Sequence, residues 1–199
     1  MRLTPALLLI GSVGFGGCGL VSDNFDGELK ADFQVDKMDH TFLNELVVNP
    51  QDYKDVRDNC AHIKKQTGQI REISLEITVP DTNMAKYGSG LVFMRHNGTV
   101  GQSWGEPAID NLVVGDFSNP WPAEAEALAV ARFDRVPIVN GMVITTAIRP
   151  AMRRVIADLI FTDNCDQPID LKMVGAADAG PVVFNGQVVF KVDFVATAG

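Results

Sequence analysis

The sequence has few of the residue patterns from which catalytic and metal sites are built. Its 199 residues include only three cysteines and three histidines. No CxxC pair is present, and His40, His62 and His96 show no spacing typical of metal ligands. A GxSxG elbow, a Walker A loop, a dinucleotide-binding glycine motif and an HExxH motif are also missing. We therefore expect no cofactor, no metal site and no catalytic residue, which favours a protein that is not an enzyme.

Positive charge is scarce as well. The chain has 17 lysines and arginines against 25 aspartates and glutamates, which gives a net charge of −8. An acidic domain repels phosphate backbones, so nucleic acid is not an expected partner. The sequence contains no fixed-period repeat and no low-complexity tract. Its length suits one domain with a substantial core, which we place at residues 28–199.

Long hydrophobic runs are absent apart from the N-terminus. A mostly apolar run from Leu3 to Phe15 follows Arg2 and leads into two glycines and a cysteine. A basic start, a short apolar segment and a small-residue exit are typical of a secretory signal peptide. The run is shorter than the roughly 20 apolar residues that a membrane-spanning helix needs. Residues 1–17 are therefore predicted to be a signal peptide, and residues 18–27 a short polar tether.

The four residues from Phe15 to Cys18 resemble a bacterial lipobox, in which a leucine-like residue and two small residues precede a cysteine. The resemblance covers residues 1–18 only, and Phe15 departs from the usual leucine. It implies cleavage between Gly17 and Cys18 and attachment of acyl chains such as palmitate to Cys18, which would anchor the chain to a membrane. Gly19 is not the aspartate that retains many such proteins at the inner membrane, which favours the outer membrane. The alternative is an ordinary signal peptide with an incidental cysteine.

Two further cysteines, Cys60 and Cys165, remain if Cys18 is acylated. An even pair in an oxidising compartment such as the periplasm predicts a disulfide. The alternative is a pair of free, buried thiols that never meet.

Alternating apolar and polar residues predict an antiparallel sheet. The alternation is clearest at residues 73–79 and is repeated at residues 29–35. Asn97-Gly98 is a two-residue hairpin signal between residues 89–96 and 99–104. Asn140-Gly141 and Asn185-Gly186 also separate segments of strand character. Further strands are predicted at residues 143–148, 169–175 and 187–197.

Three helices are predicted between the strands. Asn49-Pro50 is a good N-cap and first turn for an amphipathic helix over residues 50–66. Residues 122–133 and 150–161 also begin with proline and have helical composition or spacing. The predicted fold class is therefore α+β: a mostly antiparallel, β-sandwich-like core with two or three short helices packed on it. A parallel βαβ fold is the alternative, which the clean alternation of several strands disfavours.

The only tryptophans, Trp104 and Trp121, lie in turn-rich segments. Exposed tryptophans could bind a sugar or a partner protein, whereas core packing is the commoner role of large aromatics. Glu72 and Glu76 could share a strand face, where carboxylates are usually just solvated.

Taken together, these patterns predict a lipid-anchored lipoprotein of the bacterial cell envelope, with the outer membrane favoured over the inner. Its β-rich domain would serve binding or structure, with a protein or carbohydrate as a possible partner. The alternative function is a periplasmic or cell-surface hydrolase whose active site is assembled from residues distant in the sequence.

Overall fold

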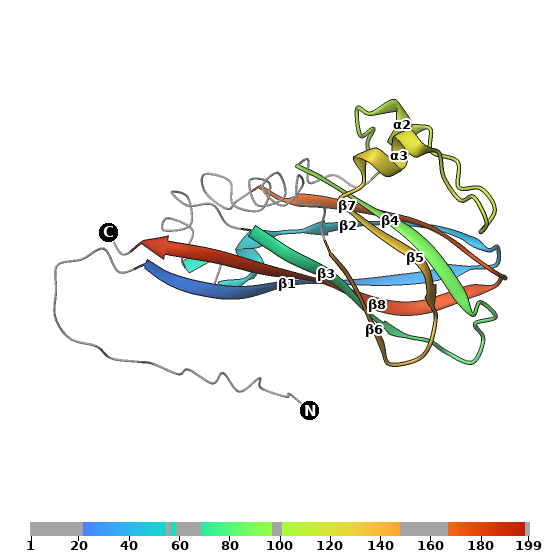
Figure 1. The fold of residues 1–199 in the computed structure, drawn as a ribbon, viewed down its shortest axis with the longest axis horizontal. Helices are drawn as coiled ribbons and strands as arrows, with labels where there is room; N and C mark the ends of the chain where they lie inside the picture. Colours follow the sequence, from blue (N-terminus) through green and yellow to red (C-terminus); the bar gives the residue numbers. More distant parts are fainter. Residues whose placement is uncertain (1–21, 55–56, 59–68, 97–100, 148–166, 198–199) are drawn as a thin grey trace.

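The computed structural model describes residues 22–54, 57–58, 69–96, 101–147 and 167–197. The strands of this part of the chain form two sheets of four strands each (Figure 1). One sheet has the order β1-β8-β3-β6 and the other has the order β2-β7-β4-β5. The strands are β1 (Ser22–Lys37), β2 (Thr41–Val48), β3 (Gln69–Thr78), β4 (Tyr87–His96), β5 (Ala131–Pro137), β6 (Met142–Ala147), β7 (Ile169–Ala177) and β8 (Val182–Thr197).

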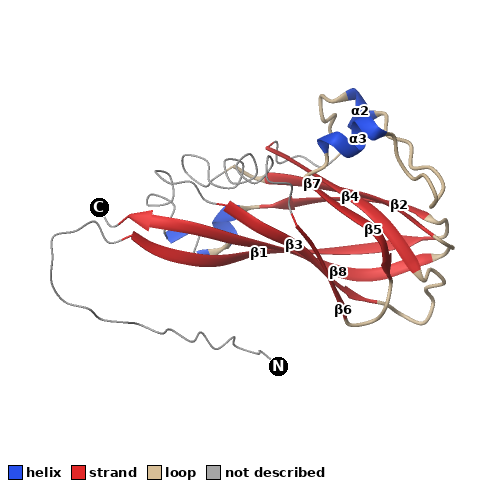
Figure 2. Ribbon diagram, viewed as in Figure 1, coloured by secondary structure: helices blue, strands red, loops and turns tan. Residues whose placement is uncertain are grey.

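All pairings between these strands are antiparallel. Each of the pairs β1/β2, β3/β4, β5/β6 and β7/β8 places one strand in each sheet, so the chain crosses between the sheets repeatedly. Eight strands wound in this way into two facing four-stranded sheets form a jelly roll. The predicted antiparallel sandwich is thus confirmed. The predicted α+β class overestimates the helix content, because the described residues hold only short helices (Figure 2).

The main core lies between the two sheets. Along β1, Phe33 and Val35 are buried whereas Asp32, Gln34 and Asp36 are exposed, which confirms the alternation read from the sequence. Phe184 of β8 meets two rings edge-on, with its centroid 5.8 Å from that of Phe33. The second ring is that of Phe42 on β2, with the centroids 5.7 Å apart. Because these rings come from both sheets, they tie the two layers together.

A second, smaller core lies on the outer face of the sheet that contains β4 and β7. An insert over residues 101–130 carries the helices α2 (Pro107–Asp110) and α3 (Ala123–Leu128), and Figure 2 shows both above this sheet. All nine residues of β7 are buried, because the facing sheet covers one side of the strand and the insert covers the other. The buried members of this second core are Leu91, Phe93, Ile109, Trp121, Ala125, Ala129 and Val174.

The helix predicted at 50–66 is confirmed in part, since residues 50–52 and the described residues 54 and 57–58 are helical. Asn49 caps a 3-10 helix, η1 (Pro50–Asp52), by accepting a hydrogen bond from the backbone N–H of Gln51 at 3.1 Å. Residues 59–66 lie outside the described part of the chain, as does the predicted helix at 150–161. The helix predicted at 122–133 ends at Leu128. Residues 131–134 alternate between buried and exposed as edge strand β5 instead.

The two Asn-Gly pairs that the structure describes do not close hairpins within one sheet. Asn185-Gly186 lies inside β8 and is not a turn at all. Gly141, with φ +75°, does form a turn after Asn140, but the strands on either side belong to different sheets. Asn97-Gly98 lies outside the described residues, and residues 101–104 form no strand. Sheet crossing, which a local turn signal does not report, explains these corrections.

The N-terminal predictions lie mostly outside the description. Residues 22–27, assigned above to the tether, belong to β1. The structure does not describe Gly17, Cys18, Cys60 or Cys165. The part of the chain that it does describe contains no disulfide. Among the residues that the structure describes, no helix has the length and apolar character needed to cross a membrane.

Candidate functional site

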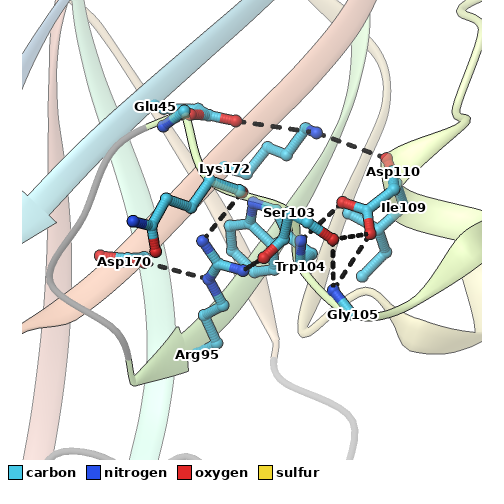
Figure 3. A network of polar contacts seen from close by, with 11 residues as sticks. Glu45, Arg95, Ser103, Trp104, Gly105, Ile109, Asp110, Asp170 and Lys172 are labelled. Atoms are coloured by element: carbon cyan, nitrogen blue, oxygen red, sulfur yellow. Dashed lines mark hydrogen bonds and ion pairs between the residues drawn. The ribbon is translucent and has the colours of Figure 1, made fainter.

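The most strongly charged part of the interior lies where the insert meets the sheet (Figure 3). Arg95 of β4 and Asp170 of β7 are directly opposite each other in the register, and their Nε and Oδ2 atoms are 3.0 Å apart. The two side chains are only 15% and 5% exposed. A buried pair of this kind fixes the position of what it touches, because leaving either charge unpaired would be costly.

A second pair lies beside the first. Glu45 of β2 is opposite Lys172 of β7, and Oε1 of the glutamate is 3.7 Å from Nζ of the lysine. Lys172 Nζ also donates a hydrogen bond to the carbonyl of Ile109 in α2, at 3.3 Å. The backbone N–H of Gly101 donates to Oε2 of Glu45 at 2.7 Å. Both charges of this pair therefore hold the insert on the sheet.

Asp110 at the end of α2 organises the start of the insert. Its carboxylate accepts hydrogen bonds from Ser103 Oγ at 2.6 Å, from Trp104 N at 2.6 Å and from Gly105 N at 3.0 Å. The Ser103 hydrogen bond, followed by that from the Trp104 backbone, lowers the pKa of Asp110. The guanidinium of Arg95 lies 4.4 Å from the centre of the Trp104 ring and also donates to the Ser103 carbonyl.

This network joins the insert to the sheet through paired charges. Its four central charges, Glu45, Arg95, Asp170 and Lys172, are paired with one another. Oδ1 of Asp170 has no hydrogen-bond partner, nor has Nε2 of nearby His96. In the described part of the chain, no group of three or more His, Cys, Asp or Glu residues could hold a metal ion.

A different surface lies at the end of the sandwich opposite to the start of β1 and the end of β8 (Figure 1). Four connections meet there, at residues 38–40, 79–86, 138–141 and 178–181, and we call this surface the loop end. Backbone hydrogen bonds join the connections: Ala177 N donates to His40 O at 2.7 Å, Met84 N to Pro181 O at 3.0 Å, and Ile138 N to Lys86 O at 2.8 Å.

Side chains add to this cross-linking of the loop end. Oδ1 of Asp178 accepts hydrogen bonds from the backbone N–H groups of Lys86 and Tyr87, at 2.8 and 3.1 Å. Asn83 Oδ1 accepts from Val183 N at 3.0 Å, and Asn140 Oδ1 accepts from Val79 N at 3.2 Å. The connections therefore hold one another in place.

Large apolar side chains nevertheless point to solvent from three of these four connections. Met38 is 86% exposed, Met84 is 61% exposed and Val139 is 55% exposed. Single exposed apolar residues are ordinary, whereas contiguous apolar patches are a feature of interaction sites.

The third candidate is a pocket of about 260 Å³ between edge strand β5, α3 and the turn at residues 115–120. Arg132 and Arg135 line it together with Phe117 and Trp121. The turn is tight: Gly115 N donates to the Pro120 carbonyl at 2.8 Å.

Of the two tryptophans singled out in the sequence, Trp121 belongs to the second core and Trp104 packs against it. Trp121 is 8% exposed and forms a wall of the pocket, whereas Trp104 is half-buried between Arg95 and Phe93. A ligand-binding role for either stays a prediction. Glu76 is exposed. The sequence analysis predicted neither the ionic network nor Arg135. The network could have been indicated by Asp170 and Lys172, which are two charges inside a strand of apolar residues.

Comparisons with known proteins give matches in structure only. No family model matches the chain, and no curated protein matches its sequence. A decameric BFDV capsid protein is 11% identical, with a TM-score of 0.44, over 86% of this chain and 99% of its own. The 60-mer of the BFDV capsid protein is 9% identical, with a TM-score of 0.42, over 90% and 96%. Desmodium yellow mottle tymovirus is 10% identical, with a TM-score of 0.36, over 100% and 98%.

These findings correct the function read from the sequence. The solved structures that the chain resembles come from viruses, among them capsid proteins. The assignment to a lipid-anchored lipoprotein of the bacterial envelope is therefore wrong, together with its outer-membrane location and its membrane partner. The alternative of an envelope hydrolase is withdrawn with it. A resemblance that covers residues 1–18 carries no information on the fold of the remaining residues.

Proposed function

We propose that this chain is a structural, non-enzymatic jelly-roll subunit that associates with other copies of itself through the loop end. The observation that carries the proposal is the exposure of Met38, Met84 and Val139 on connections that hydrogen bonds hold together. A preorganised surface loses little conformational entropy when it binds, so its apolar area contributes efficiently to association.

A second copy of the chain suits this surface because the loop end carries both signs of charge. Lys37 and Asp39 flank Met38, and the exposed Asp81 and Lys86 flank Met84 in the same way. When two identical surfaces meet about a twofold axis, each residue type can face its complement on the other copy. Lysines among the aspartates of this surface thus reduce the repulsion that a net charge of −8 would otherwise cause.

The BFDV capsid protein also self-associates, as a decamer and as a 60-mer. Because the chain is only 11% identical to the decameric capsid protein, this similarity concerns the fold alone. The proposal rests on the geometry of the loop end.

The test measures the mass of the full chain by light scattering over a range of concentrations. We expect the wild type to associate and the triple variant Met38→Ser, Met84→Ser, Val139→Ser to stay monomeric at the same concentrations. The control is Val47→Ser with Leu128→Ser, which removes apolar side chains that are 41% and 37% exposed elsewhere on the surface. It should associate like the wild type. A wild type that remains monomeric, or a triple variant that associates normally, would refute the proposal.

A further inference from the structure

The pocket beside α3 contains the only residue other than glycine with a positive φ in the described part of the chain. Arg135 has φ +47°, in the left-handed region that favours glycine. Its position follows from a bulge: Val136 pairs with Gly88 and Phe133 with Gly90, which leaves Asp134 and Arg135 opposite Ser89 alone.

A buried hydroxyl holds this conformation. Oγ of Ser89, a side chain that is 3% exposed, accepts a hydrogen bond from Arg135 N at 2.9 Å. Backbone strain of this kind persists only where the surroundings enforce it, and it is concentrated at functional positions. Strand β5 is at the edge of its sheet, so the bulge directs the arginine without disturbing a further strand.

The side chain of Arg135 is supported but not neutralised. Its guanidinium lies 5.1 Å from the centre of the Phe117 ring. Among the described residues it forms no ion pair, whereas neighbouring Arg132 donates to Glu126 and, at 3.2 Å, to Asp134. Arg132 thus pairs with both carboxylates of the pocket. The planar guanidinium of Arg135 can therefore donate hydrogen bonds to a ligand.

We infer that this pocket binds a small monocarboxylate that carries an apolar or aromatic group. The Arg135 guanidinium would donate two parallel hydrogen bonds to the carboxylate, and the apolar group would lie against Phe117 and Trp121. Glu126 and Asp134 line the same space and balance the charges of Arg132 and Arg135. A second negative charge on the ligand therefore gains little, whereas desolvating a doubly charged phosphate costs more than desolvating a carboxylate. The volume of about 260 Å³ suits a ligand of one ring.

Benzoate is a suitable ligand for calorimetric titration of the full chain, with benzamide as its neutral counterpart and phenyl phosphate as its dianionic one. We expect benzoate to bind more tightly than either. Arg135→Gln should weaken benzoate binding by about tenfold or more, since charge-assisted hydrogen bonds are lost. Lys54→Gln removes one largely exposed positive charge elsewhere and should leave the affinity unchanged.

Two measurements keep the result decisive. Far-UV circular dichroism establishes that Arg135→Gln is folded, and Phe117→Leu provides a second variant that keeps the arginine but removes its ring support. Phe117→Leu should weaken benzoate binding by a smaller factor. Absence of benzoate binding, equal binding of benzoate and benzamide, or an unchanged affinity in both pocket variants would overturn the inference. The pocket uses residues other than Met38, Met84 and Val139. The binding experiment therefore tests the pocket independently of self-association.

Discussion

The ring of Phe33 on β1 occupies the space that a side chain on Gly186 of β8 would need. The two residues are directly opposite in the register, and a Cβ on Gly186 would lie 2.3 Å from Cζ of Phe33. The other sheet repeats the relationship: Phe42 is opposite Gly175, whose Cβ would lie 2.0 Å from the ring. Both rings then meet Phe184 edge-on. Two glycines inside strands therefore make room for the aromatic centre of the sandwich.

Replacing Gly186 with alanine should destabilise the protein. The added methyl group forces the Phe33 ring out of a packed core, and overpacking of this kind costs about 1–3 kcal/mol. Urea unfolding of Gly186→Ala against the wild type measures the loss. Gly90→Ala is the matched control, because its Cβ would meet nothing closer than the Val174 carbonyl at 3.4 Å. Equal stability of the two variants would show that the Phe33 ring does not need the glycine.

Removing one partner of the buried ion pair should destabilise the protein further. Asp170→Ala leaves the guanidinium of Arg95 without its carboxylate, and losses of about 3–5 kcal/mol follow when one charge of a buried pair is removed. The double variant Arg95→Met, Asp170→Leu should recover much of that loss, since no charge is then left unpaired. Lys54→Ala is the control, because its bridge to Asp58 is largely exposed and should leave stability nearly unchanged. A double variant no more stable than Asp170→Ala would contradict this account.

The insert should loosen in acid through Asp110. Its pKa in the folded chain lies below the ordinary value of 3.8, mainly because Ser103 donates a hydrogen bond to the carboxylate. The unfolded chain therefore binds this proton first as the pH falls, so the stabilisation is complete above pH 3.8 and is lost below it.

Urea unfolding of the wild type and of Asp110→Asn on either side of pH 3.8 tests this sign. The wild type should be the more stable above that pH, and the difference should shrink as the pH falls below it. Asp81→Asn, on an exposed connection, controls for the loss of a negative charge. A stability difference that stays constant or grows in acid would refute the assignment.

The strands could be predicted from the sequence because half-buried antiparallel strands impose a period of two, as at Phe33 and Val35. Strand β7 departs from that rule, since the insert buries Asp170 and Lys172 on its outer face. The strand order could not be predicted, because crossing between sheets depends on contacts distant in sequence. Gly186 is an example of a position that local sequence misassigns. Asn185-Gly186 is a local turn signal, but the close packing of Phe33 against Gly186 keeps the pair inside a strand.

The candidate sites were less predictable than the fold. Trp121 was selected for its residue type, and its position in the pocket wall depends on a turn that folds back at residues 115–120. Arg135 carries no sequence signal, because the bulge that orients it arises from pairing with β4. The loop end is likewise assembled from four connections spread over most of the chain. The N-terminal resemblance to a lipobox contributed nothing to any of these sites.

Oxidation of the methionines by hydroxyl radicals, followed residue by residue with mass spectrometry, tests self-association through the loop end most directly. Met38 and Met84 are exposed in the single chain, whereas Met173 is buried and serves as the internal reference. In dilute protein Met38 and Met84 should oxidise rapidly. At concentrations where light scattering detects association, both should become protected while the oxidation of Met173 stays low. Association without protection of Met38 and Met84 would contradict the account, because the copies would then meet through another surface.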